Sequence, residues 1–142
     1  MTLDPDADVW HLPVIGLQVV DVWFSGELYV IAYGKGDLKR ALPAPRTQIR
    51  LGGAFLLRTA DGIEHRLNAA EPWSTLVPVL ALRHAHIAAA TADRNGVLDL
   101  RFDDGSVLSA DPDPHYENWE ISGPDALNLV SPPGGGDPRI SS

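Results

Sequence analysis

Carboxylates and one histidine crowd the segment Asp111-Pro112-Asp113-Pro114-His115-Tyr116-Glu117-Asn118-Trp119-Glu120. Such side chains can act in general acid–base catalysis or hold a hydrolytic metal ion. The alternating prolines, however, predict a loop for the first part of the segment. In the strand that follows, alternation would place Glu117 and Trp119 on one face and Glu120 on the other, so the acids need not converge. The simpler interpretation is a solvated edge whose charges block unwanted strand addition.

Two other groups of residues have ligand-type side chains. His84 and His86 could place two imidazoles near one metal ion, but no third ligand lies at short spacing. His84 also suits the last turn of a helix, where a basic side chain complements the helix dipole. The run Asp103-Asp104-Gly105-Ser106 looks like part of a calcium loop but lacks the downstream glutamate, and it predicts a hairpin turn. We therefore assign no catalytic, cofactor-binding or metal-binding residue.

Aromatic residues next to the acids have two interpretations. Tyr116 and Trp119 could form a ligand-stacking or interface patch, because aromatic side chains are enriched at interaction hot spots. Trp119 could equally be a core residue beside Ile121. Trp10, which stands in an acidic N-terminal segment, is a candidate surface anchor for a homodimer.

The elements that position these residues are mostly extended. Runs rich in β-branched and aromatic residues at 14–24 and 28–33 predict a hairpin around Ser25-Gly26-Glu27. Pro43 and Pro45 predict a loop after it. Gly52-Gly53, in the middle of an extended run, indicates a bulge or a close approach to the backbone.

Three further tight turns are predicted at Asp61-Gly62, Asn95-Gly96 and Asp104-Gly105, each between extended runs. In residues 97–102 apolar and charged residues alternate, so Leu98, Leu100 and Phe102 should face the core. Leu76, Val79, Leu80 and Arg83 recur at helical spacing and predict one helix over residues 75–84, with Pro78 in its first turn. The sequence thus predicts an α+β fold: a mainly antiparallel sheet of about eight strands, built from hairpins and a meander, with one main helix packed on it. Residues 12–136 would form this single domain, with tails at 1–11 and 137–142.

Composition limits the class of partner. The net charge is −8, and residues 71–142 carry four Lys/Arg against eleven Asp/Glu, a balance of −7. Such a chain has no basic face for nucleic acid or for anionic membranes. It has no cysteine, which excludes disulfides and thiolate chemistry. The N-terminus does not have the pattern of a signal peptide, and no apolar run is long enough for a membrane span, so we expect a cytoplasmic protein.

The C-terminal part of the chain carries a resemblance. Tyr116-Glu117-Asn118-Trp119-Glu120, Gly123-Pro124 and Pro133-Gly134-Gly135 are similar to the C-terminal signature of a family of small, uncharacterised actinobacterial proteins with a domain of unknown function. The resemblance covers residues 12–136 and transfers no catalytic residue. In that family the glycines tend to precede a final apolar strand, whereas here Asp137-Pro138-Arg139 follows. Size and acidity resemble, more loosely, those of immunity proteins from bacterial toxin systems.

We therefore expect a non-enzymatic interaction module that binds a basic protein partner through its acidic C-terminal half, or that self-associates. The alternative is a small-molecule binder or hydrolase with a pocket between helix and sheet and with His84, His86 or His115 at its mouth. The residues expected to contact a partner are Asp99, Asp103, Asp104, Asp111, Asp113, His115, Tyr116, Glu117, Trp119 and Glu120.

Overall fold

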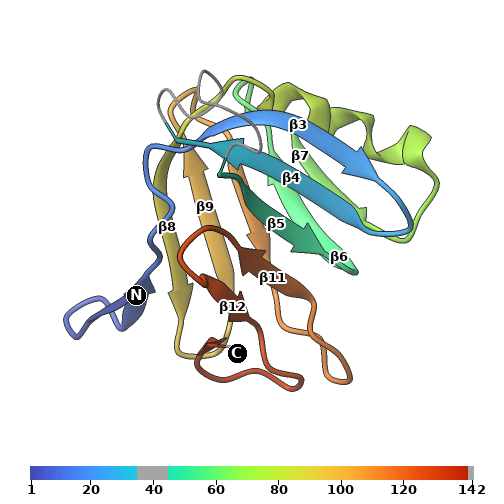
Figure 1. Ribbon diagram of the computed structural model, residues 1–142. Coiled ribbons are helices and arrows are strands. Elements are labelled where there is room, and N and C mark those ends of the chain that lie inside the picture. Colours follow the sequence, from blue (N-terminus) through green and yellow to red (C-terminus); the bar gives the residue numbers. More distant parts are fainter. Residues whose placement is uncertain (35–44, 141–142) are drawn as a thin grey trace.

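The computed structural model describes residues 1–34 and 45–140, and over these residues the chain forms two antiparallel sheets and one 3₁₀ helix (Figure 1). Sheet A has seven strands in the order β1-β2-β8-β9-β10-β6-β7, and sheet B has six in the order β13-β12-β11-β5-β4-β3. Sheet A comprises β1 (Thr2–Asp4), β2 (Val9–His11), β6 (Ala54–Arg58), β7 (Glu64–Asn68), β8 (Ile87–Asp93), β9 (Leu98–Phe102) and β10 (Val107–Ala110). Sheet B comprises β3 (Gln18–Phe24), β4 (Leu28–Tyr33), β5 (Thr47–Leu51), β11 (Trp119–Ser122), β12 (Asn128–Val130) and β13 (Arg139–Ile140).

The predicted tight turns are confirmed. Asp61-Gly62 joins β6 to β7, Asn95-Gly96 joins β8 to β9, and Asp104-Gly105 joins β9 to β10. The three glycines have φ values of 86°, 90° and 91°, a region that costs glycine little because it has no Cβ. The hairpin around Ser25-Gly26 is also present, as β3 and β4. The loop predicted at Pro43 lies outside the described residues.

The chain changes sheets at Gly52-Gly53. β5 belongs to sheet B and β6 to sheet A, so these residues do not form one bulged strand, and the bulge interpretation is wrong. The close approach is confirmed, because a Cβ at Gly53 would lie 2.1 Å from the hydroxyl oxygen of Tyr116. The pair of glycines is therefore a corner between two sheets.

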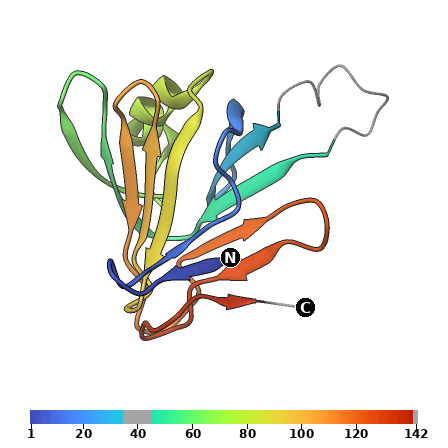
Figure 2. The same ribbon diagram turned by 90° about the vertical axis from the view of Figure 1, so that its left-hand side faces the viewer.

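A second connection joins the sheets at β3 and β8. Gln18 and His86 form an isolated antiparallel bridge, and the Ile87 amide donates to the Leu17 carbonyl at 2.8 Å. Figure 2 shows the two sheets packed face to face, closer together at the bottom of the view than at the top. Leu98, Leu100 and Phe102 are buried between them, as the alternation in residues 97–102 predicts.

The predicted helix differs in type and in extent. It is a 3₁₀ helix, η2 (Trp73–Leu82), with Pro78 inside it. Its buried residues Leu76, Val79 and Leu82 recur every third position, which matches the three residues per turn of a 3₁₀ helix, whereas Leu80 is 42 % exposed. Proline has no amide hydrogen and its ring hinders the regular α-helical bond, which favours the tighter helix.

The predicted α+β class is wrong, because the fold is mostly β. Two sheets enclose the core, and η2 contacts β3 of sheet B and β7 of sheet A, the edge strands of the two sheets. A main helix covering one sheet was inferred from a single apolar stripe. That inference missed the second sheet, since pairing between distant strands leaves no local pattern in the sequence.

The two expected tails contain regular structure. Residues 1–11 include the hairpin of β1 and β2, which continues sheet A at β8. Trp10 packs against the core, and its indole N–H donates to Asp137 at 3.0 Å. Arg94 donates to the same carboxylate, so Asp137 lies beside both the N-terminal hairpin and the β8–β9 turn.

Candidate protein-interaction site

The acidic loop, residues 111–118, connects β10 of sheet A to β11 of sheet B. Backbone bonds hold it at two points: the Gly52 amide donates to the Asn118 carbonyl, and the Gly134 amide donates to the Asp113 carbonyl, each at 2.8 Å. The Asn118 side-chain nitrogen donates to the carbonyls of Asp111, at 2.7 Å, and Ala54, at 2.9 Å. The loop is therefore fixed against the corner where the chain changes sheets.

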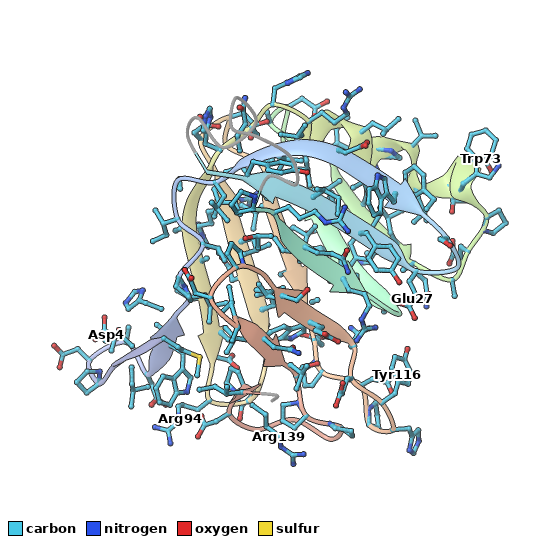
Figure 3. All side chains as sticks on the ribbon, viewed as in Figure 1. Asp4, Glu27, Trp73, Arg94, Tyr116 and Arg139 are labelled. Atoms are coloured by element: carbon cyan, nitrogen blue, oxygen red, sulfur yellow. The ribbon has the colours of Figure 1, made fainter. Side chains whose placement is uncertain are left out.

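Tyr116 lies over that corner. An added Cβ would lie 3.7 Å from its ring at Gly52 and 2.1 Å from its hydroxyl at Gly53, so the glycines make room for the phenol. The side chain stays 44 % exposed and projects from the end of the molecule away from Trp73 (Figure 3). Burial raises the pKa of Tyr116, and the hydrogen-bonded Asp113 carboxylate raises the pKa further, so the phenol remains a donor.

A cavity of about 210 Å³ lies beneath the acidic loop. It is lined by Ala54, Phe55, Leu56, Arg66, Leu67, Ser109, Asp111, Pro112, Asp113 and Asn118. Leu56 stands opposite Arg66 and Ser109 in the sheet register, so β6, β7 and β10 form its floor. The carboxylates come from the loop above.

The acids of the C-terminal half differ in their partners. Asp99 pairs with Arg101, Asp103 with His86, and Glu120 with Arg50, at distances of 3.1, 3.1 and 3.3 Å. The carboxylates of Asp111 and Glu117 have no cationic partner within the part of the chain that the structure describes, nor has that of Asp113, whose bonds are to neutral donors. Negative charge is thus uncompensated at the acidic loop.

The ten expected contact residues do not form one surface. Because β9 and β10 are antiparallel, the turn with Asp103 and Asp104 lies at the opposite end of this hairpin from the acidic loop. Asp99 stands opposite Ser109 in the same hairpin, on the loop side. The structure brings together Asp111, Asp113, His115, Tyr116 and Glu117 on the loop.

Trp119 and Glu120 follow the loop but have other roles. Trp119 is fully buried, and its indole N–H donates to the Gly96 carbonyl at 2.9 Å, so it is a core residue and not a contact residue. Glu120 stands beside Arg50 in sheet B and belongs to a charged group with Glu27 and Tyr29. Of the two interpretations of Trp119, the structure selects the core.

The three candidate histidines do not converge. His86 bonds to Asp103 at one end of the β9–β10 hairpin, and His115 belongs to the loop at the other end. His84 follows η2 with a φ of 74° and is exposed. Among residues 1–34 and 45–140, no three His, Cys, Asp or Glu side chains gather in a way that could hold a metal ion.

The sequence analysis missed two residues of the site, Arg50 and Asn118, and identified a third, Gly53, only in part. Arg50 reaches the Glu117 carbonyl at 3.3 Å from the neighbouring strand, and no local pattern indicates this contact. Asn118 was read only as part of a motif, although an amide before a buried strand could have suggested loop anchoring. Gly53 was recognised as a close approach, but its neighbour was not identified.

The chain belongs to a family of unknown function, DUF6188, whose family model matches residues 10–137. This supports the resemblance to an uncharacterised family. Neither a curated protein nor a solved structure matches the chain. No helix within the described ranges is long and apolar enough to cross a membrane.

Proposed function

We propose that the protein is a non-enzymatic interaction module that binds a basic protein partner through its acidic loop. The observation that carries the proposal is the set of carboxylates at Asp111, Asp113 and Glu117, which have no cationic partner within residues 1–34 and 45–140. Between Arg101 and Arg139 the sequence has eight Asp/Glu and no Lys or Arg, so no neighbouring side chain in that segment offsets them. A field of one sign speeds encounter with a partner of the other sign.

The rigidity of the loop supports the same function. Its backbone is bonded to Gly52 and Gly134, and its base is held by the Asn118 side chain. A loop that is already ordered loses little conformational freedom when a partner binds, which favours affinity. The small size and the acidity of the chain favour one version of this function, which is an immunity-like role in the cytoplasm. The partner would then be a basic toxin. We expect no binding to nucleic acid or to anionic membranes.

The test compares two variants of equal net charge. The loop variant is Asp111→Asn, Asp113→Asn and Glu117→Gln; the control is Asp6→Asn, Glu71→Gln and Asp125→Asn, which neutralises three exposed acids outside the loop. The product of a neighbouring gene is the first candidate partner. The rate at which this partner associates with the protein should fall about tenfold for the loop variant and much less for the control.

The dependence of the association rate on salt concentration gives an independent test. Between about 50 and 300 mM salt the Debye length shortens from about 14 to about 6 Å, so association of the unmodified protein should slow. Equal effects of the two triple variants, or association that is indifferent to salt, would contradict the proposal. Tight binding of DNA or RNA at 300 mM salt would contradict the charge argument as well.

Self-association is the second candidate, and one observation favours it. Trp73, Val77 and Leu80 of η2 are 67 %, 44 % and 42 % exposed. Val77 and Leu80 are three residues apart and lie on one side of this 3₁₀ helix, outside the buried row, and Trp73 is exposed at its first residue. Sedimentation equilibrium should then show a dimer that Trp73→Ser weakens, and a monomer at all concentrations would exclude it. The separated histidines give no support to the alternative of a hydrolase pocket.

A further inference from the structure

The size of the cavity beneath the acidic loop restricts what it can hold. Small-molecule sites usually measure about 300–1,000 Å³. The cavity of about 210 Å³ is below this range, so it suits one side chain better than a nucleotide or a cofactor.

The side-chain oxygen of Asn118 is a buried hydrogen-bond acceptor at this cavity. Asn118 is 3 % exposed and lines the cavity, yet its Oδ1 has no hydrogen-bond partner within the described residues. The Nδ2 hydrogens are directed to the carbonyls of Ala54 and Asp111, so a flipped amide would place its oxygen against two other oxygens. The orientation is therefore fixed, and Oδ1 requires a donor from outside the described contacts.

The other polar groups define the charge of that donor. Asp111 and Asp113 line the same cavity, and their carboxylates have no cationic partner in the described part of the chain. Two anionic acceptors beside a neutral acceptor favour a cation that only donates, as the ammonium of lysine and the guanidinium of arginine do. Leu56, which is partly exposed on β6, offers an apolar surface along which the methylene groups of such a side chain can lie.

Arg66 lies at the cavity, and Tyr116 lies beside Asn118. Arg66 contributes to the rim, but its side chain is 82 % exposed and its guanidinium pairs with Glu64 at 3.6 Å, so it stays in solvent. The Tyr116 hydroxyl and the Asn118 Oδ1 would lie 2.1 and 2.9 Å from the same added Cβ at Gly53. Tyr116 is therefore adjacent to the amide oxygen, and its side chain is partly exposed.

We infer that this cavity receives a lysine or arginine side chain of the partner, with Asn118 Oδ1 and the carboxylates of Asp111 and Asp113 as the acceptors. The inference rests on the proposed function and specifies how the acidic loop recognises a basic surface. Charge alone would attract any basic protein, whereas a cavity for one cationic side chain selects a residue at a fixed position.

The test uses single residues as probes. Nα-acetyl-lysine methylamide and Nα-acetyl-arginine methylamide are titrated into the ¹⁵N-labelled full chain, and amide resonances are followed by NMR. We expect saturable shifts of the Asn118 side-chain amide and of the backbone amides of Leu56 and Ser109. Nα-acetyl-methionine methylamide, which has similar length and no charge, should produce no such shifts. The lysine and arginine probes together show which cation the cavity prefers.

Variants of equal charge complete the test. Asp111→Asn with Asp113→Asn should weaken binding of the preferred probe about tenfold, whereas Asp6→Asn with Asp125→Asn should change it less than about twofold. Equal weakening by the two pairs, or equal shifts with the uncharged probe, would overturn the inference. If the loop variant slows association with the partner but neither cationic probe shifts these amides, the cavity assignment fails and the proposed function stands.

Discussion

Replacing Trp119 tests whether the two sheets depend on one large side chain. Trp119 is fully buried on β11, and its indole N–H donates to the Gly96 carbonyl in the β8–β9 turn of sheet A. Trp119→Ala would remove most of the buried side chain and leave that carbonyl without its donor. Large-to-small substitutions of this kind cost about 3–5 kcal/mol of unfolding free energy. For 142 residues this corresponds to a fall in Tm of roughly 10–17 °C.

Trp119→Phe separates packing from hydrogen bonding. Phenylalanine keeps much of the apolar contact but has no N–H, so the Gly96 carbonyl loses its partner at a cost of about 1–3 kcal/mol. Trp73→Ala is the matched control, because Trp73 is 67 % exposed and its loss should change stability by less than about 0.5 kcal/mol.

The measurement is urea unfolding followed by far-ultraviolet circular dichroism. Fluorescence is less suitable, because the chain has four tryptophans and each variant removes one. The expected order of stability is Trp73→Ala above Trp119→Phe above Trp119→Ala. A loss below about 1 kcal/mol for Trp119→Ala, or equal losses for the two alanine variants, would refute the placement of Trp119 in the core.

Three further predictions concern the corner, pH and the chain ends. Gly53→Ala should cost about 1 kcal/mol, because its Cβ displaces the Tyr116 hydroxyl, and adding Tyr116→Phe should restore part of this loss in urea unfolding; no restoration would show that the clash lies elsewhere. The backbone N–H of His86 lowers the pKa of Asp103 below 3.8, so the stabilisation is present above about pH 4 and is lost as pH falls through the folded value. The stability gap between the unmodified protein and Asp103→Asn should therefore close between about pH 5 and pH 2, and a gap independent of pH would contradict this. Asp137→Ala should change the unfolding free energy only slightly because the contact is exposed, yet it should speed hydrogen exchange in β13, and unchanged exchange would show that this strand does not depend on the carboxylate.

The sequence predicted the local parts of the fold and not their assembly. Asn95-Gly96 and Asp104-Gly105 indicate turns because two residues determine the backbone there. Pairing of β5 with β11 joins Ile49 to Ile121, and no local pattern encodes a contact between residues so distant. The second sheet was missed for this reason.

The sequence predicted the location of the helix η2 but not that it is a 3₁₀ helix. Apolar residues at 76, 79 and 80 fit an α-helical stripe, and apolar residues at 76, 79 and 82 fit the three-residue spacing of a 3₁₀ helix. The structure buries positions 76, 79 and 82 instead, since η2 lies against the edges of two sheets and Pro78 disfavours the regular α-helical bonds. Tertiary contacts therefore decided which of two apolar patterns is the buried one.

The candidate site was predictable in its charges but not in its geometry. The acidity of residues 111–120 is visible in the sequence, whereas the cavity exists only because β6 and β10 are neighbours in sheet A. Some of the ten expected residues lie at opposite ends of the β9–β10 hairpin, and this separation follows only from the pairing register of the two strands. The charge of the segment follows from its composition, whereas the meeting of its side chains with those of β6 and β7 follows from the strand order of sheet A.

Asn118 connects the stability of the acidic loop to its proposed recognition role. Its nitrogen anchors the loop to Ala54 and Asp111, while its oxygen has no partner within the described residues and is the acceptor that we assign to the partner's cationic side chain. Removing Asn118 would loosen the loop and alter the cavity together, and a loss of binding in such a variant could not separate the two effects. Asp111 and Asp113 differ in this respect, because their carboxylates can be replaced by amides of the same shape without removing the anchor. Recognition at this site is therefore best separated from folding through charge and not through Asn118.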